Sequence, residues 1–271
     1  VRLGAGCAAP CLAAAVSLGQ PELTARDAVA DSRGNIHVVW YGRFTGPNGP
    51  VRPYTSMRAA DGTWTAAESL DPGYDTGEIA VAVDPTGGLH ALWKRNDSGD
   101  TRLVYRYRPA NGAWQPVAPL LNTANLVSPD FLGSDSRGNL YAVGWEQYIS
   151  DGPYLLVKRA GQGWSWSDDF YNRLKSIINP VAVTIGPDDR LAILGRISIA
   201  PDEATTGIVT RTPDGQLSVE TGLPFTLGNL LYYFYMSRDG ATYVIHSDTW
   251  GEPTNLYLRA PAGDWSEGMP L

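Results

Sequence analysis

The chain has 271 residues, and its 30 glycines and 20 prolines disfavour long helices, because both residues interrupt helix interiors. With 10% aromatic residues, this composition favours an all-β protein of short strands and tight turns. The formal net charge of -7, without a run of Lys or Arg, argues against nucleic acid as a partner and against insertion into an anionic membrane.

The N-terminal segment, residues 1–24, contains the apolar stretch CAAPCLAAAVSL. This stretch is too short to span a membrane and lacks the basic start and cleavage pattern of a complete signal peptide, so we expect residue 1 to follow a processing site or a trimmed end. Cys7 and Cys11 leave two interpretations open, a local disulfide or two free thiols. Two cysteines alone cannot build a tetrahedral metal site, and we expect neither a metal nor a cofactor.

A repeat organises the rest of the chain. Its turn position recurs at intervals of 53, 51, 51 and 51 residues, at Gly34, Gly87, Gly138, Asp189 and Gly240. In each copy one apolar run precedes the turn and another follows it, as in IAVAVD and GLHALW of the second copy. The pattern predicts five β-hairpins.

The residues at these turns explain the reversal of the chain. Asp31, Asp84 and Asp135 can accept hydrogen bonds from the backbone amides that follow, and the glycine three positions later supplies a positive φ. Asp189 replaces the glycine in the fourth copy, where aspartate is one of the few side chains tolerated.

Each copy continues with two further runs. A third run, such as RLVYRYRPA, follows a variable loop, and a short turn then leads to a fourth. The fourth run begins at one repeat position, held by Trp64, Trp114, Trp164, Leu217 and Trp265. We expect these tryptophans to pack in the core. Each copy therefore provides four strands.

Four-stranded antiparallel sheets repeated without helices are typical of β-propeller blades. Neighbouring blades cover both faces of the middle strands, which explains why GLHALW is nearly continuously apolar. We predict an all-β, five-bladed β-propeller over residues 25–271, with part of a six- or seven-bladed propeller as the alternative. The copies span residues 25–70, 71–120, 121–170, 171–222 and 223–271.

Both ends of the chain resemble a fourth strand. Residues 11–22 are similar to the segment WTAAESLDPGYD, and the C-terminal DWSEGMPL provides a second candidate. Either the ring closes with both ends in one blade, or the chain is cut from a longer propeller. We favour the closed ring, with the closing strand in the N-terminal segment.

The pattern D-x-x-G-x-[IL]-H-x-x-W, followed by Y-x-x-x-x-x-x-G-x-W, resembles the repeats of bacterial sialidase-like propellers, the group that carries bacterial neuraminidase repeats. The resemblance covers residues 25–271 and concerns fold more than activity, because glycoside hydrolases and lectins share this framework. The Asp-box of that family reads Ser-x-Asp-x-Gly-x-x-Trp, whereas RAADGTW and PANGAW keep the Gly and Trp at a shortened spacing. An active sialidase would carry three arginines for the substrate carboxylate, a Tyr with a nearby Glu, and an acid/base Asp.

In a propeller the loops between second and third strands open on one face, where we expect the functional site. Arg43, Arg95 and Arg196 come from three copies and are candidates for a clamp on an acidic sugar, with Tyr41 beside them. Glu146 and Asp248 hold matching positions in copies three and five and are the candidate catalytic carboxylates of a glycosidase. Solvated loop acids are the alternative interpretation of this pair.

Two tryptophans are candidates for stacking on a sugar ring. Trp145 falls one residue later in its copy than Trp40 and Trp93 do in theirs, and Trp250 has no counterpart in the other copies. By contrast, we expect Trp40 and Trp93 to pack between blades.

The three histidines divide into two groups. His37 and His90 share one repeat position with Tyr141, which favours a structural role, because a catalytic or metal-bound histidine should be unique to its site. His246 stands outside this pattern, adjoins SDTW and is a further ligand-binding candidate.

These observations favour a secreted or cell-surface bacterial protein that binds a carbohydrate or an extracellular protein without catalysis. A sialidase-like exo-glycosidase is the second hypothesis. A scaffold or assembly domain of a larger extracellular protein is the third. The sequence does not indicate an oligomeric state.

Overall fold

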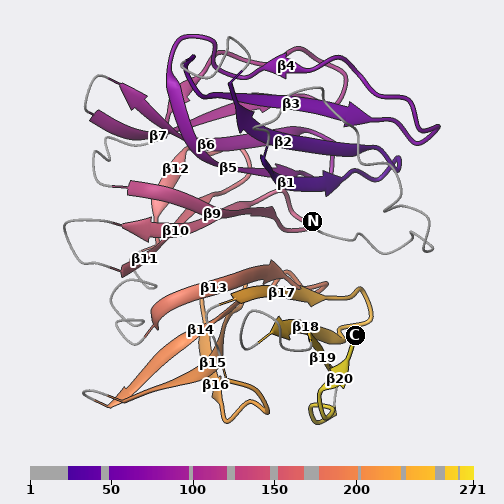
Figure 1. Cartoon of the computed structure of the whole chain (residues 1–271), viewed down its shortest axis with the longest axis vertical. Helices are drawn as coiled ribbons and strands as arrows, with labels where there is room; N and C mark the ends of the chain where they lie inside the picture. Colours follow the sequence, from indigo (N-terminus) through magenta and orange to yellow (C-terminus); the bar gives the residue numbers. More distant parts are fainter. Residues whose placement is uncertain are drawn as a thin grey trace. The chain divides into compact units, whose positions relative to one another are not determined.

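The computed structural model describes residues 24–43, 49–97, 100–120, 126–146, 152–167, 177–200, 203–226, 230–247, 254–261 and 263–271. In these residues it contains five four-stranded antiparallel sheets and no helix (Figure 1). Strands follow one another across each sheet in chain order, the blade topology of a five-bladed β-propeller. The predicted fold class is confirmed.

The first three sheets are built from the following strands. The first sheet holds β1 (Thr24–Ala30), β2 (Ile36–Gly42), β3 (Arg52–Arg58) and β4 (Glu68–Ser69). The second holds β5 (Asp75–Val83), β6 (Leu89–Asp97), β7 (Asp100–Arg108) and β8 (Ala118–Pro119). The third holds β9 (Leu126–Ser134), β10 (Leu140–Glu146), β11 (Gly152–Lys158) and β12 (Trp164–Trp166).

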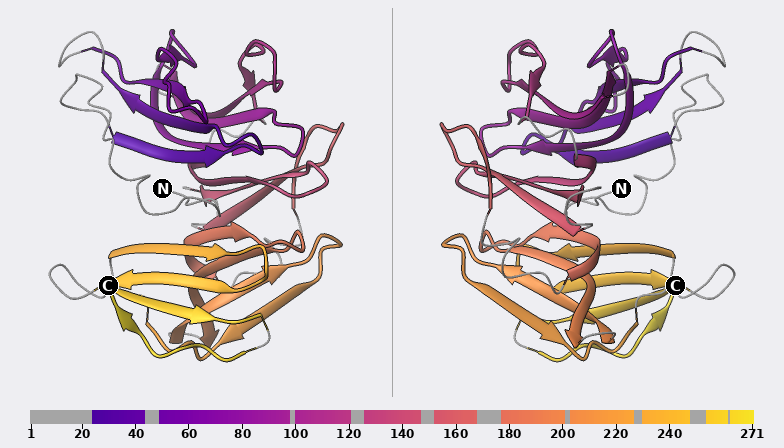
Figure 2. Two further views of the ribbon diagram at one scale, coloured as in Figure 1. Left: turned by 90° about the vertical axis from the view of Figure 1, so that its right-hand side faces the viewer. Right: turned by 90° about the vertical axis from the view of Figure 1, so that its left-hand side faces the viewer.

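The last two sheets repeat the same order. The fourth holds β13 (Ile177–Ile185), β14 (Leu191–Ala200), β15 (Glu203–Arg211) and β16 (Leu217–Thr221). The fifth holds β17 (Leu230–Met236), β18 (Thr242–Ser247), β19 (Asn255–Arg259) and β20 (Met269–Pro270), which Figure 2 shows as neighbouring strands. The C-terminal strand predicted from DWSEGMPL is thus present, whereas the N-terminal closing strand lies outside the described residues and stays a prediction.

The chain forms two compact units. One holds the first two sheets and most of the third, and the other holds the fourth and fifth sheets. Each unit has its own hydrophobic cluster. Among the described residues there is no helix long and apolar enough to cross a membrane.

The predicted hairpin turns are confirmed. All five aligned turn positions have a positive φ, including Asp189 at 64°. In the second sheet the Asp84 carboxylate accepts hydrogen bonds from the amides of Thr86 and Gly88, at 2.8 and 2.9 Å. Asp31 and Asp135 accept the equivalent pairs of hydrogen bonds in their own turns.

A side chain six residues after the turn aspartate completes each of these three turns. His37 Nε2 lies 3.2 Å from Asp31 Oδ2, and Tyr141 donates its hydroxyl to Asp135 Oδ2 at 3.1 Å. His90 makes the same contact with Asp84 at 3.0 Å. The structural role predicted for this repeat position is confirmed.

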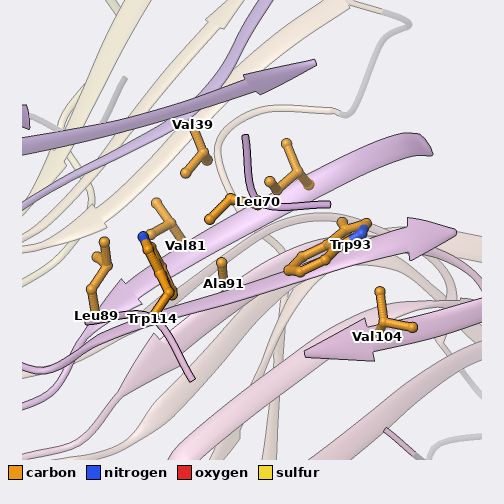
Figure 3. Packing of buried hydrophobic residues seen from close by; sticks show 9 residues of the cluster. Val39, Leu70, Val81, Leu89, Ala91, Trp93, Val104 and Trp114 are labelled. Carbon is orange, nitrogen blue, oxygen red and sulfur yellow. The ribbon is translucent and has the colours of Figure 1, made fainter. Parts of the chain in front are cut away.

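The core of the first unit joins neighbouring sheets. Val39 and Leu70, from the first sheet and the loop after it, pack with Val81, Trp93 and Trp114 of the second copy (Figure 3). Trp93 is fully buried, in keeping with the packing between blades predicted for it. Residues 89–93 are all buried, so both faces of β6 are dry.

The prediction that every fourth-run tryptophan packs in the core is wrong for Trp64, which is 38% exposed. Trp114 packs on residues of the first sheet, and Trp164 makes an edge contact with Tyr105 of the second sheet at 5.6 Å between centroids. Trp265 packs against a cluster that contains residues of the fourth sheet, among them Ile208. These three tryptophans therefore cover the sheet that precedes them in the chain, and among the described residues no sheet precedes the one that carries Trp64.

Candidate functional site

The face where the sequence predicted a site is described only in part. The segments that follow the second strands, residues 44–48, 98–99, 147–151, 201–202 and 248–253, lie outside the described residues. Asp248 and Trp250 belong to these segments, and Cys7 and Cys11 of the N-terminal segment also lie outside the described residues. Trp145 and Glu146 end β10, whose pairing with β9 is irregular before Gly144 and again between Trp145 and Glu146, and the structure describes only the backbone of these two residues. Their roles stay predictions.

Of the three predicted clamp arginines, two lie in the first unit and one in the second. Arg95, in the first unit, lies with its guanidinium carbon 3.1 Å from the centre of the Tyr74 ring and its Nε 3.7 Å from Asp71 Oδ2. Arg43 follows β2 in the same unit, two residues after the half-buried Tyr41. Arg196 is exposed on β14 of the second unit. Convergence of the three on one ligand remains a prediction.

His246 is buried, with 1% of its surface exposed, in the second unit. Its ring centroid lies 6.1 Å from that of Phe225 and 6.3 Å from that of Tyr257. The side chain thus stands among aromatic rings, and its predicted role in ligand binding is untested.

A groove of about 610 Å³ lies within the first unit, between the second and third sheets. Its walls come from the β5–β6 turn, β6, β7 and the segment between β7 and β8 on one side, and from the β9–β10 turn, the end of β11 and the turn after it on the other. The side chains that matter for its chemistry are Asp84, His90, Tyr105, Tyr107, Gln115, Arg137 and Lys158. The groove opens at the hairpin-turn end of β6, opposite to the end where the sequence predicted a site.

Three side chains form a hydrogen-bonded chain along one wall. Asp84 Oδ2 lies 3.0 Å from His90 Nε2, and His90 Nδ1 lies 2.6 Å from the Tyr105 hydroxyl. Burial by itself would raise the pKa of Asp84, but hydrogen bonds from Thr86, His90 and Gly88 hold it below the ordinary 3.8. The carboxylate is therefore ionised at neutral pH.

The other two hydrogen-bonded side chains, His90 and Tyr105, are uncharged at neutral pH. Burial lowers the pKa of His90 below the ordinary 6.5, more than the Asp84 carboxylate raises it, and the Lys158 charge lowers it further. Burial also raises the pKa of Tyr105 well above the ordinary 10, with smaller contributions from Tyr107 and Asp84.

Aromatic rings make this wall stiff. Tyr107 stacks on His90 at 4.7 Å between centroids and an interplanar angle of 23°. Tyr105 is held from the other side by the edge contact with Trp164. Both tyrosine rings are therefore packed against other rings along the groove.

The opposite wall carries two cations. Neither the Lys158 ammonium nor the Arg137 guanidinium forms an ion pair with a carboxylate in the part of the chain that the structure describes. The only carboxylate lining the groove in that part, Asp84, is occupied by its own turn and by His90. In a chain with a net charge of -7, this wall of the groove is therefore locally cationic.

The junction between the first and second sheets shows why the groove is open. Arg108, at the repeat position of Lys158, places Nη2 3.4 Å from His37 Nδ1 and lies 5.2 Å over the Trp114 ring. Arg33 Nη1 donates to Asn111 Oδ1 at 3.1 Å and so bridges the two sheets. Two arginines thus span the first junction.

The second junction has shorter side chains at the same repeat positions. Thr86 replaces Arg33, and Gly161 replaces Asn111, so this bridge cannot form. In the first sheet Nδ1 of His37 faces Arg108, whereas in the second sheet Nδ1 of His90 is hydrogen-bonded to Tyr105. The first sheet has Thr55 at the repeat position of Tyr105. The signal in the sequence was therefore a difference between copies, at positions that are neither unique histidines nor loop acids.

The fold defines the class of this chain, a five-bladed β-propeller. No family model matches the chain, and no curated protein matches it. Solved structures are similar in fold. A protein of unknown function from Dyadobacter fermentans is 10% identical, with a TM-score of 0.57 over 92% of this chain and 83% of that one.

Three further solved structures are also similar to this chain. An ulvan lyase is 10% identical with a TM-score of 0.56, over 90% of this chain and 68% of the lyase. A neuraminidase-like protein from A/bat/Guatemala is 11% identical with a TM-score of 0.51, over 92% of this chain and 74% of that one. A puromycin hydrolase is 17% identical with a TM-score of 0.53, over 90% of this chain and only 38% of the hydrolase. At these identities the likeness concerns the fold alone.

Proposed function

We propose that this chain is a secreted or cell-surface carbohydrate-binding propeller, and that it holds an acidic glycan in the groove between its second and third sheets. The observation that carries the proposal is the pair of cations without carboxylate partners, Lys158 and Arg137, facing the tyrosines of β7. Ammonium and guanidinium groups form strong, charge-assisted hydrogen bonds with carboxylates and sulfates.

The other lining groups suit a sugar. A few polar groups among aromatic side chains are the usual composition of a small-molecule site. Tyr105 and Tyr107 offer ring surface and hydroxyl groups, and Gln115 offers an amide with both a donor and an acceptor. A sugar acid can use all of these groups together.

The groove supports binding better than glycoside hydrolysis. Most glycosidases use two carboxyl groups on opposite sides of the scissile bond. Among the described residues the groove has only Asp84, which is already engaged in the turn and with His90. A single carboxylate that is already hydrogen-bonded favours binding without catalysis.

Calorimetry with hexagalacturonate, and with maltohexaose as a neutral probe of equal length, tests the proposal. Lys158→Met should weaken hexagalacturonate binding about tenfold, because a charge-assisted hydrogen bond is lost. Arg159→Met is the matched control, because it removes the same charge from an adjacent residue that does not line the groove. Equal losses in both variants, equal binding of both sugars, or no binding of hexagalacturonate would contradict the proposal.

A further inference from the structure

We infer that Asp84 and His90 fix the direction of the Tyr105 hydroxyl proton, so that Tyr105 accepts a hydrogen bond from the ligand at neutral pH and donates one in acid. Tyr105 would then determine specificity, and Asp84 and His90 would be positioning residues. The part of this inference that concerns a ligand rests on the proposed function. The part that concerns the protons does not.

The donors and acceptors of these hydrogen bonds follow from the ionised carboxylate of Asp84. An ionised carboxylate only accepts hydrogen bonds, so His90 Nε2, at 3.0 Å from Asp84 Oδ2, must carry the proton. A neutral imidazole then has a bare Nδ1, which accepts. The Tyr105 hydroxyl, at 2.6 Å from Nδ1, must donate to it.

The first sheet supports the same tautomer independently. His37 Nε2 lies against Asp31, and His37 Nδ1 faces Arg108 Nη2 at 3.4 Å. A guanidinium has donors and no acceptor, so Nδ1 of this histidine must also be the accepting nitrogen. The turn aspartate thus sets one tautomer in both sheets.

This arrangement specifies what the ligand must offer. With its proton directed to His90, the Tyr105 oxygen has only lone pairs left for the groove, and a ligand must meet it with a donor such as a sugar hydroxyl. Lys158 and Arg137 require an acidic group on the same ligand. A hydroxyl and an acid on one ring, as in a uronate, satisfy both walls.

In acid, the donor and the acceptor of the hydrogen bond between Tyr105 and His90 exchange roles. Protonation places a hydrogen on His90 Nδ1, so that Tyr105 must accept from it and its own proton turns to the groove. The charged and titratable groups that face His90 are Asp84, Tyr105, Tyr107, Lys158 and Arg137. Since the pKa of His90 is lowered, the reversal occurs below the ordinary value of 6.5. A donating Tyr105 next to two cations should bind an anion more tightly.

The tautomer is measured without any ligand. Nitrogen-15 NMR of the three histidines, with His90 assigned by its loss in His90→Gln, should show His90 protonated on Nε2 at pH about 7.5. Tyr105→Phe should shift the Nδ1 resonance and keep the tautomer, and it provides the assignment if His90→Gln fails to fold. Protonation on Nδ1, or an Nδ1 resonance unchanged by Tyr105→Phe, would overturn the inference.

The consequence for binding is measured with hexagalacturonate. At pH about 7.5 Tyr105→Phe should weaken binding about tenfold, and the ratio of wild-type to Tyr105→Phe affinity should change as the pH falls through the pKa of His90, which the same nitrogen-15 resonances measure. The substitution removes no charged side chain, so a ratio that is constant across this pH range would overturn the reversal. If hexagalacturonate does not bind, the proposed function fails, while the NMR result still decides the direction of the protons.

Discussion

At the scale of residues, the turn aspartate and its partner six positions later form the repeated unit of this chain. In three copies the partner is His37, His90 or Tyr141, and each bonds to its aspartate. Gly186 replaces the acid in the fourth copy, where the partner position carries Ala192. The partner is thus polar where there is a carboxylate to satisfy, and the aspartate decides which nitrogen of a histidine is protonated.

The buried histidines should make stability depend on pH. Burial is the main cause that lowers the pKa of both His37 and His90. As the pH falls, the two histidines of the unfolded chain therefore become protonated near pH 6.5, whereas those of the folded protein become protonated only at a lower pH. Their contribution to stability is complete above pH 6.5 and is lost as the pH falls toward their lower, folded values.

We expect urea unfolding to give a smaller free energy of unfolding at pH about 5.5 than at about 7.5. His37→Gln combined with His90→Gln should flatten this dependence, because Gln does not titrate and can still donate to the aspartate. An unchanged dependence in that variant would show that other groups cause it. A second loss below pH 3.8 should follow from the lowered pKa values of Asp31 and Asp84.

At the scale of elements, neighbouring sheets with the same strand order form different junctions. Arg33 and Arg108 span the junction of the first two sheets. Thr86 and Lys158 at the same positions leave a groove at the next junction. A binding site can therefore arise inside a repeat protein by shortening side chains at one junction, without a change of backbone topology.

Restoring the longer side chains should close the groove. In Thr86→Arg combined with Gly161→Asn, the new arginine should reach the new asparagine as Arg33 reaches Asn111. Asparagine is tolerated at the φ of 73° that Gly161 adopts. We expect hexagalacturonate affinity to fall more than about tenfold, with the thermal unfolding midpoint within a few degrees of wild type. Unimpaired binding by a folded variant would place the ligand elsewhere.

At the scale of the whole molecule, stability comes from sheets that cannot bury both faces alone. The two hydrophobic clusters each join residues of successive sheets, one in each compact unit. Equivalent side chains can therefore differ in burial according to what their sheet packs against. Trp114 is 9% exposed and Trp64 is 38% exposed, although they share a repeat position.

The two tryptophans should differ in their contribution to stability. Trp114→Ala should lower the free energy of unfolding by about 3 kcal/mol or more, because it leaves a cavity between two sheets. Trp64→Ala should lower it by less than about 1 kcal/mol. Denaturant unfolding of both variants measures the difference, and equal losses would show that Trp64 is buried in the folded protein.

The sequence by itself determined the number of copies, the four strands in each, the hairpin turns and the structural role of His37 and His90. These features follow from local chemistry that recurs at a fixed interval, so each copy confirms the others. The interval of 51 or 53 residues and the turn glycines contain this information without any knowledge of packing.

Only the tertiary structure decided where the groove lies and that Trp64 remains exposed. Lys158 and His90 are 68 positions apart in the chain, and nothing local shows that a lysine of the third sheet faces a histidine of the second. Whether a junction is closed depends on side-chain reach across two sheets, as with Arg33 and Asn111. Repetition predicts what the copies share, whereas a site depends on how two adjacent copies differ.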